Sequence, residues 1–492
     1  MITALPILTP LMIVVFLLMA GRKVSWLKSI GLGGVILLFG VNIYIFQQVS
    51  NQGILVTQAG GWQAPFGITL VIDLLSAIML AITSFVALMV GLYALRGIND
   101  QRHQRHFFLF FHTLMMGVNG AFIAGDIFNM YVWFEVMVIS SFVLITLGSE
   151  KQQLEGAIKY VTMNLLGSFL FLAGIGLVYG KTGTLNLADL SLTVSQSDQP
   201  FVMNSSFILF FMAFGIKAAI FPFFFWLPSS YHTPPVAVTA MFAGLLTKVG
   251  VYAMFRFFTL YISQISPFWQ TLLLVIAGLT MVIGVLAAAS QFDIRRILSF
   301  HIISQIGYMI MGLGIFTGFA LAAALYFMIH NILAKTAAFL AGGLVFEKTG
   351  SYQLKSIGGV FKEHPWLGLL FFMPAMALAG LPPLSGFFGK LFLIKGGFES
   401  GHFIITGIAI WVSIVTLFSM MKIWNEAFWK PHPKGDKGIK PLKLKPSMVY
   451  PVAILALSTL AFGLFAEWFM DLLLEAGDLL KNPQTYINAV LK

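Results

Sequence analysis

The sequence predicts an all-α polytopic membrane protein with about fourteen transmembrane helices. Of its 492 residues, 59% are hydrophobic and only 10% are charged, and the mean hydropathy is +0.91. Soluble domains of this length carry roughly a quarter charged residues, so the composition excludes an ordinary soluble protein. Many apolar runs reach the roughly 20 residues that a helix needs to cross the hydrocarbon, whereas a β-barrel shows short alternating segments.

The apolar runs recur along the whole chain and give the order of the expected helices. The first run has no basic leading region and no typical cleavage site, so we expect a helix rather than a removed signal. The expected spans are 4–20, 27–47, 69–95, 107–125, 127–148, 160–180, 206–231, 235–257, 269–290, 299–317, 320–346, 369–398, 405–428 and 448–474.

The net charge of +11 follows the expected topology. If both termini lie on the outer side of a cell membrane, nineteen of the 29 basic residues fall on inner loops. Such an excess on inner loops is usual in membrane proteins, so the charge gives no support to nucleic-acid binding. The longest polar segment, residues 429–446, is an inner basic loop that either anchors to anionic lipid or docks a partner. Five basic residues fall on outer segments: Lys181, Arg256, Lys395, Lys481 and Lys492.

Four lysines and one glutamate lie well inside expected helices: Lys217, Lys248, Lys335, Lys390 and Glu135. A lysine at the centre of a spanning helix costs about 2.5 to 3.5 kcal/mol on insertion scales. Burial without a partner disfavours the charged form, so such a lysine can hold or release a proton near neutral pH. These residues are therefore candidate proton-transfer groups.

A structural ion-pair network that fixes helix packing is the alternative explanation for these charges. The number of acids argues against it, because Glu135 and Asp73 are the only carboxylates expected deep in the membrane. At least two of the central lysines therefore lack a carboxylate of their own. Lys422 lies nearer the inner end of its helix, where it either reaches the interface or takes part in function.

Other polar side chains accompany the lysines. The segment HNILAK places His330 on the same helix as Lys335, and SFHIISQIGY supplies His301, Ser304 and Gln305. Singly, such residues usually make hydrogen bonds between packed helices. Together they predict a polar line at mid-membrane, in which His330, His301 and Ser304 are candidate relay groups.

Two expected helices are interrupted close to a lysine. Pro222 follows Lys217, and two prolines precede Lys390 in LAGLPPLSGFFGK. Proline removes a backbone donor and clashes with the preceding turn, so the seventh and twelfth helices should be broken. Broken helices at corresponding places in two halves indicate inverted repeats with an ion site at the midplane. The expected units are helices 1–3 in 1–106, two five-helix repeats in 107–257 and 269–428, and the last helix and tail in 448–492.

The sequence predicts no cofactor. The chain lacks cysteine, which excludes disulfides, thiolate metal sites and cysteine-ligated iron–sulfur clusters. The segment GFFGKL lacks the spacing and hydroxyl of a phosphate-binding loop, so we expect no nucleotide. A hard-cation site needs several oxygens, and Asp73, Glu135 and the hydroxyls near them are too few and scattered to form one, which leaves any metal site unknown.

These features together resemble the antiporter-like membrane subunits shared by respiratory complex I, membrane-bound hydrogenases and Mrp-type multisubunit Na+/H+ antiporters. The stretches WLPSSYHTPP and FNMYVWFE are most similar to the D-type subunits of Mrp antiporters. The resemblance implies fourteen helices with two inverted five-helix repeats, in a hetero-oligomeric complex that exchanges sodium for protons. The segments that carry it are GDIFNMYVWFEVMVISSFVLI, FGIKAAIFPFFFWLPSSYHTPPVAVTAMFAGLLTKVGVY, QFDIRRILSFHIISQIGYM, HNILAKTAAFLAGG and MALAGLPPLSGFFGK.

The resemblance assigns roles residue by residue. Glu135 matches the glutamate of helix 5, and Lys217, Lys248 and Lys335 match the lysines of helices 7, 8 and 11. Lys390 falls where members of the family have lysine or glutamate.

Two departures from the family pattern affect the relay groups. Complex I relatives typically have Asp-Ala-His after WLP, where this chain has Ser-Ser-Tyr, so Tyr231 and the next residue, His232, are the candidates there. Asn331 stands where Mrp relatives would have a second histidine, so the relay at that point uses His330 alone or a water.

The implied function is secondary transport rather than enzymatic catalysis. Protons would enter a half-channel near Lys248, pass Lys335 and reach a second half-channel at Lys390. Glu135 and Lys217 would form an ion pair whose opening changes the proton affinity of Lys248. The expected partners are other membrane subunits and lipid, with H+ and Na+ as transported ions. Two alternatives stay open: a proton-pumping subunit of a complex I-like or hydrogenase-type redox complex, and a non-transporting scaffold or lone channel.

Overall fold

The structure is a computed structural model that describes residues 2–195, 200–261, 267–433, 435 and 444–492. Most described segments are helical, which confirms the predicted all-α membrane class. The middle of the expected basic loop, residues 434 and 436–443, lies outside the described residues. The α-helices are α1 (Leu5–Met19), α2 (Val24–Gln52), α3 (Leu74–Gly97), α4 (Asp100–Gln104), α5 (Phe107–Ile123), α6 (Ile127–Thr146), α7 (Lys151–Thr182), α8 (Leu187–Ser195), α9 (Pro200–Ala218), α10 (Trp226–Ser230), α11 (Val236–Met241), α12 (Thr247–Tyr261), α13 (Pro267–Ser290), α14 (Ile294–Ile315), α15 (Gly318–Thr349), α16 (Val360–Glu363), α17 (Pro365–Ala379), α18 (Ser385–Glu399), α19 (Phe403–Trp424), α20 (Pro446–Leu464), α21 (Ala466–Lys481) and α22 (Gln484–Leu491).

Several short elements join these helices. Two strands form a small antiparallel sheet, which was not predicted from the sequence. Their segments, LVTQ and TLVI, are rich in β-branched residues, which favour strands. The remaining elements are β1 (Leu55–Gln58), β2 (Thr69–Ile72), the 3₁₀ turns η1 (Ile2–Ala4), η2 (Ala59–Gly61) and η4 (Leu354–Ser356), and the π-helical segments η3 (Phe242–Leu246) and η5 (Asn425–Trp429).

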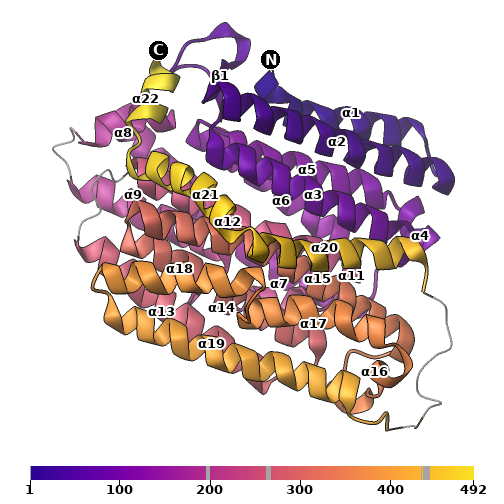
Figure 1. Ribbon diagram of the computed structural model, residues 1–492. Helices are drawn as coiled ribbons and strands as arrows, with labels where there is room; N and C mark the ends of the chain where they lie inside the picture. The colour runs from indigo at the N-terminus through magenta and orange to yellow at the C-terminus, as the bar shows by residue number, and fades with distance from the viewer. Residues whose placement is uncertain (1, 196–199, 262–266, 434, 436–443) are drawn as a thin grey trace.

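The two chain termini lie at the same end of the helical array. The N-terminal turn η1 packs against both strands, and the Gln58 side chain of β1 donates to the Val490 carbonyl of α22 at 3.4 Å. Figure 1 shows both ends beside this sheet. Termini at the same end are expected of a chain that crosses the membrane an even number of times.

The described residues contain eleven helices long and apolar enough to span a membrane. Three shorter apolar helices, at Phe107–Ile123, Asn204–Ala218 and Pro365–Ala379, overlap the expected fourth, seventh and twelfth spans. Together with the eleven longer helices they make fourteen, which agrees with an even number of crossings. The count of fourteen stays a prediction, because the three shorter helices fall below the usual length of a span.

The seventh expected helix is broken, as the proline predicts. Helix α9 ends at Ala218 and α10 begins at Trp226, with Pro222 between them. The indole of Trp226 donates to the carbonyl of Ile216 at 3.0 Å, and the backbone N–H of Phe221 donates to the Thr280 hydroxyl at 3.0 Å. Side chains thus satisfy backbone groups that the break releases.

The twelfth expected helix is broken in the same way. Helix α17 ends at Ala379, α18 begins at Ser385, and Gly380 between them has φ of 91°, a conformation that suits glycine. A Cβ on Gly386 would lie 1.8 Å from the Ala377 carbonyl oxygen, so the two half-helices approach closely only because this residue is glycine.

Matching local features favour the two predicted repeats, which stay a prediction. Helices α7 and α15 each have 32 residues, and each ends in Lys-Thr followed by a glycine with φ of 70° or 77°. After α7, Asn186 forms an isolated β-bridge with Asp126, the residue that caps the preceding helix α6. After α15, Gln353 forms the same kind of bridge with Asp293, which caps α14. Both long helices begin or end beyond the apolar runs, because polar flanking residues such as those of Lys151–Lys159 continue a helix well.

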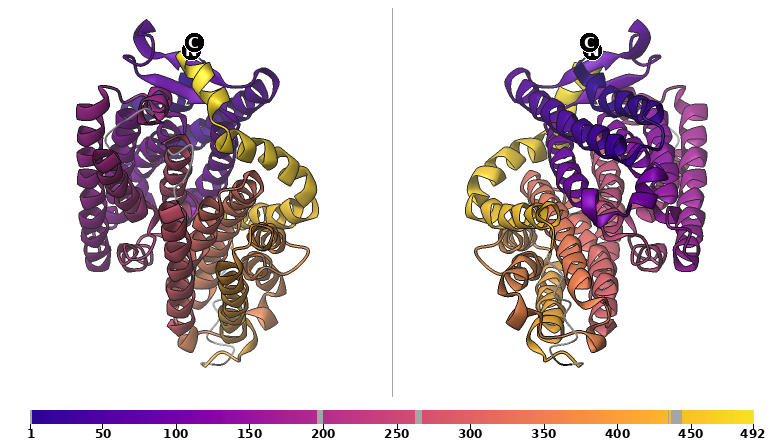
Figure 2. Two further views of the ribbon diagram at one scale, coloured as in Figure 1. Left: turned by 90° about the vertical axis from the view of Figure 1, so that its left-hand side faces the viewer. Right: turned by 90° about the vertical axis from the view of Figure 1, so that its right-hand side faces the viewer.

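Helix α15 lies at the centre of the molecule and is buried over nearly its whole length. It packs against α14, α17, α18, α20 and α21. Figures 1 and 2 show the N-terminal half of the chain on one side and α13 to α19 on the other, with α20 and α21 crossing between them. The expected last helix is thus two helices, α20 and α21, which meet at Phe465.

Candidate functional site

Lys217 lies at the end of α9, just before the break, and is 3% exposed. Its Nζ donates to the Ser168 hydroxyl at 3.0 Å and to the Asn164 carbonyl at 3.1 Å, both on α7. The Ser168 hydroxyl also contacts the Glu135 carboxylate of α6. Ser168 therefore joins the lysine to the glutamate.

The expected Glu135–Lys217 ion pair is not a direct contact. No ion pair between these two described side chains is present, and the serine hydroxyl occupies the position between them. This hydroxyl is also 3.0 Å from the Asn164 carbonyl. It has one proton, so it can donate either to the carboxylate or to that carbonyl, but not to both.

Sequence reasoning missed Ser168. Serines are common in membrane helices, where they usually donate to their own helix backbone, so Ser168 carries no distinguishing signal. The available clue was its spacing of four residues from Asn164, which puts two polar groups on one face of an otherwise apolar helix.

Replacing Ser168 with alanine is expected to lower the transport rate about tenfold or more, because a hydrogen bond to a charged group contributes about 1.5 to 3 kcal/mol. The measurement is ion-driven proton movement in vesicles that hold equal amounts of complex.

Ser140→Ala is the matched control, because that buried hydroxyl donates only to its own helix, at Val136. Ser168→Thr keeps the hydroxyl and should restore the rate. Equal losses in Ser168→Ala and Ser140→Ala would show that Ser168 serves packing alone.

Lys248 follows the π-helical segment η3 at the start of α12 and is 1% exposed. Its Nζ donates to the Ala243 carbonyl at 2.7 Å, five residues back. A π-helical turn is rare and is often found at functional sites. The widened turn supplies a backbone acceptor to a lysine that has no carboxylate partner among the described residues.

Lys335 and His330 lie on the buried helix α15. The Nζ of Lys335 donates to the Leu298 carbonyl of α14 at 3.3 Å. The Nδ1 of His330 lies 2.8 Å from the Ser385 hydroxyl, at the start of α18, and its Nε2 has no partner in the described residues. The Oδ1 of Asn331 also lacks a partner in the same part of the structure. Free buried polar atoms of this kind usually hold water, which fits a hydrated relay.

Lys390 lies at the break of the twelfth expected helix. Its Nζ donates to the carbonyls of Leu378 and Ala379, at 3.0 and 2.8 Å, and to the Ser413 hydroxyl at 2.9 Å. The lysine thus caps the C-terminal end of α17, where the helix dipole favours a positive charge. His330 reaches the other side of the same break through Ser385.

The polar residues expected on the tenth helix lie on α14 and are fully buried. The Nε2 of His301 contacts the Ser419 hydroxyl of α19, and Ser304 donates to the Met281 carbonyl at 3.0 Å. Neither amide atom of Gln305 has a partner in the described residues. Ser304 therefore has a packing contact, whereas His301 and Gln305 keep free polar atoms in the interior.

Lys422 caps the end of another helix. Its Nζ donates to the carbonyls of Ala289 and Gln291, at 2.7 and 2.5 Å, and lies 4.6 Å from the centre of the Phe292 ring. These contacts hold the charge at the end of α13, where a cation stabilises a helix.

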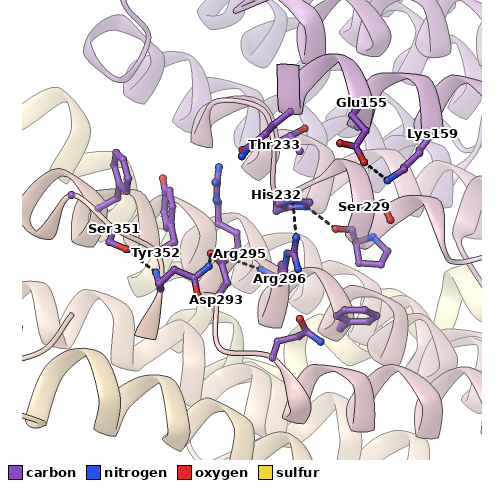
Figure 3. A pocket seen from close by; sticks show the side chains of 18 residues that line it. Glu155, Lys159, Ser229, His232, Thr233, Asp293, Arg295, Arg296, Ser351 and Tyr352 are labelled. Carbon is purple, nitrogen blue, oxygen red and sulfur yellow. Dashed lines mark hydrogen bonds and ion pairs between the residues drawn. The ribbon is translucent and has the colours of Figure 1, made fainter. Parts of the chain in front are cut away.

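Tyr231 and His232 have different environments. Tyr231 is fully buried between the rings of Trp226 and Phe242, and its hydroxyl has no partner in the described residues. His232 lines a polar cavity of about 640 Å³ (Figure 3). Burial and the charge of Arg296 lower the pKa of His232, against the effect of its hydrogen bond to Pro228, so this ring is neutral at pH 7.

The charge count assigned Arg256 to an outer segment, but the structure places this residue inside a helix. It is 3% exposed within α12, and its guanidinium binds both carboxylate oxygens of Asp73, at 2.6 and 2.7 Å. Asp73 caps α3 by accepting from Ser76. Asp73 is thus neutralised by an arginine, which leaves the central lysines without it.

No group of three or more His, Cys, Asp or Glu side chains in the described ranges could hold a metal ion. Glu135 and Asp73 lie in separate clusters, each with its own partners.

Comparison with known proteins identifies the family of the chain. Residues 124–417 match the family described as NADH:quinone oxidoreductase/Mrp antiporter, TM. The D-type subunit of the Na(+)/H(+) antiporter of Alkalihalophilus pseudofirmus is 45% identical over 490 residues, which cover 99% of each chain.

Two solved structures have the same fold. A chain of the Mrp complex from Dietzia sp. DQ12-45-1b is 30% identical with a TM-score of 0.91, over 100% of this chain and 99% of that one. A chain of the archaeal membrane-bound sulfane sulfur reductase is 26% identical with a TM-score of 0.92, over 99% of both chains. The chain therefore belongs to the membrane-subunit family of NADH:quinone oxidoreductases and Mrp antiporters, and within it to the D-type subunits of Mrp antiporters.

Proposed function

We propose that this chain translocates protons as one subunit of a multisubunit Na+/H+ antiporter. The observation that carries the proposal is the set of four buried lysines, which bind carbonyl and hydroxyl oxygens and no carboxylate among the described residues. Such a lysine can exist with or without its extra proton at little difference in free energy. A structural ion pair would instead fix the charge.

In this proposal protons enter near Lys248 and pass along α15 by way of Lys335 and His330. They reach Lys390 at the break in the twelfth expected helix and leave by a second half-channel. The free Nε2 of His330 and the free Oδ1 of Asn331, judged within the described residues, support a hydrated connection at the middle of this path.

The group of Glu135, Ser168 and Lys217 would control the path. While the serine donates to the carboxylate, the negative charge favours the protonated lysine. When the hydroxyl turns to the Asn164 carbonyl, that coupling weakens and the lysine releases its proton more readily. The change in charge would alter the proton affinity of Lys248 on the neighbouring helix α12.

The partners in this proposal are the other membrane subunits of an Mrp-type complex in the cell membrane, with both termini on the outer side. The similarity to the Na(+)/H(+) antiporter chain from Alkalihalophilus pseudofirmus supports this assignment. We assign no sodium site to this chain.

The alternative is a proton-pumping subunit of a redox-driven complex. The likeness to the archaeal sulfane sulfur reductase, which is a respiratory membrane complex, is consistent with this alternative but is less specific than the likeness to Mrp subunits. The two functions differ in the energy source: an ion gradient alone drives an antiporter, whereas a redox pump needs electron transfer.

The test is proton movement by the purified complex in sealed liposomes. We expect a sodium gradient to drive protons in the opposite direction without any electron donor. Proton movement that requires an electron donor and acceptor, and that ignores the sodium gradient, would establish the redox alternative instead.

A further inference from the structure

A polar cavity of about 640 Å³ opens between the two predicted repeats at the end where the inner loops are expected. It is formed by the start of α7, the segment after α10, the start of α14 and the end of α15. Figure 3 shows His232, Arg295 and Arg296 along one wall and Ser351 and Tyr352 beside them. The mechanism proposed above uses none of these residues.

The charges of the cavity leave two guanidinium groups unpaired. Lys159 binds Glu155 at 2.6 Å, so these two opposite charges cancel. Asp293 accepts from the backbone N–H of Arg296 at 3.1 Å and from the Gln353 amide at 3.1 Å. Within the described residues, neither Arg295 nor Arg296 forms an ion pair with a carboxylate.

The contacts of the two arginines position them without using most of their donors. Arg295 packs 4.0 Å from the centre of the Tyr352 ring and donates once, to the Pro234 carbonyl at 3.3 Å. Its Nε is buried and has no partner in the described residues. Arg296 donates one N–H to the Nε2 of His232 at 3.4 Å. A guanidinium has five N–H donors, so most of them remain available.

The ring of His232 is oriented as an acceptor toward Arg296. Its Nδ1 lies 2.8 Å from the Pro228 carbonyl, which can only accept, so Nδ1 carries the proton. The histidine thus holds the Arg296 side chain against the cavity wall. Hydroxyl groups of Ser229, Thr233 and Ser351 also line the cavity.

We propose that this cavity binds a phosphate group between Arg295 and Arg296. Planar guanidinium groups match phosphate oxygens in pairs, and such charge-assisted hydrogen bonds are among the strongest in proteins. Lys159, Arg295 and Arg296 are the positively charged side chains of the cavity, and Glu155 and Asp293 are the negatively charged ones. The resulting excess of one positive charge suits a phosphate diester, which carries a single negative charge. Basic pockets between transmembrane helices on the inner side commonly hold anionic lipid headgroups, and a free phosphate offers the same chemistry.

This inference goes beyond the proposed proton path and does not depend on it. Phosphate binding requires only the charges and donors of the cavity. Binding and transport are measured separately, so either can fail without the other.

The test uses the purified complex and two radiolabelled probes, dioctanoylphosphatidylglycerol and inorganic phosphate. The variant is Arg296→Gln, because this exposed side chain contacts only His232 through its guanidinium and its replacement leaves the Arg295–Tyr352 packing intact. The matched control is Lys355→Gln, which removes an exposed positive charge at the same end of the molecule, outside the cavity.

We expect wild type and Lys355→Gln to bind a probe with equal affinity, and Arg296→Gln to bind it about tenfold or more weakly. An effect on the lipid probe alone identifies a lipid headgroup, and an equal effect on inorganic phosphate identifies a free phosphate. The proposal is wrong if neither probe binds saturably. It is also wrong if Arg296→Gln weakens saturable binding of both probes no more than Lys355→Gln does.

Discussion

Replacing Lys248 or Lys390 with methionine is expected to reduce sodium-dependent proton exchange at least about 100-fold, the contribution typical of a positioned proton-transfer group. Methionine has a similar length and no charge, so it fills the same space without an exchangeable proton. Each lysine makes its polar contacts with carbonyl or hydroxyl oxygens, and loss of these contacts leaves no carboxylate unpaired. The measurement is exchange in everted vesicles from a host without other antiporters, with the amount of assembled complex determined in parallel.

The matched control is Lys395→Met. Lys395 lies on the same helix as Lys390, but it is exposed and pairs with Glu399 one turn away at 3.8 Å. We expect this variant to exchange at the wild-type rate. Wild-type exchange by Lys248→Met and Lys390→Met, with the complex intact, would remove both lysines from the proton path and leave packing as their function.

Asp73→Asn is expected to destabilise the protein by about 3 to 5 kcal/mol, the usual cost of leaving a buried charge without its partner. The Arg256 guanidinium binds both carboxylate oxygens of Asp73, and it also contacts the hydroxyls of Ser76 and Tyr252. Tyr486 of α22 lies against the same guanidinium, 5.1 Å from its ring centre. The pair therefore joins α3, α12 and the C-terminal helix. The measurement is the midpoint of thermal unfolding of the purified complex.

Asp100→Asn is the control for this prediction. Asp100 also pairs with a basic residue, Lys28 at 2.7 Å, but its side chain is exposed, so its loss should leave the midpoint unchanged. Adding Arg256→Gln to Asp73→Asn should cost much less than the two single losses added together, because both remove the same interaction. Additive losses would mean that the two residues act independently.

Local features of the chain were sufficient to predict the fold class and the two broken helices. Apolar length and composition act within one segment, and proline disrupts the helix in which it stands, so neither needs the tertiary structure. The same reasoning found the buried lysines, because a charge within an apolar run is visible in the sequence. It failed at the helix ends, where α7 begins at Lys151 rather than near residue 160, because polar helix-forming residues extend the helix beyond the membrane.

The partners of these charges were decided by the tertiary structure alone. The sequence analysis counted Arg256 with the outer basic residues and expected Glu135 to pair directly with Lys217. The sequence gave no sign that Ser168 would separate that pair. It also could not show that Lys390 caps a half-helix or that a π-helical segment supplies the acceptor for Lys248. The physical reason is that insertion into a membrane depends on the composition of each helix, whereas a hydrogen bond between helices depends on how they pack. The chain's composition therefore determined that buried charges exist, and only the packing determined which groups they contact.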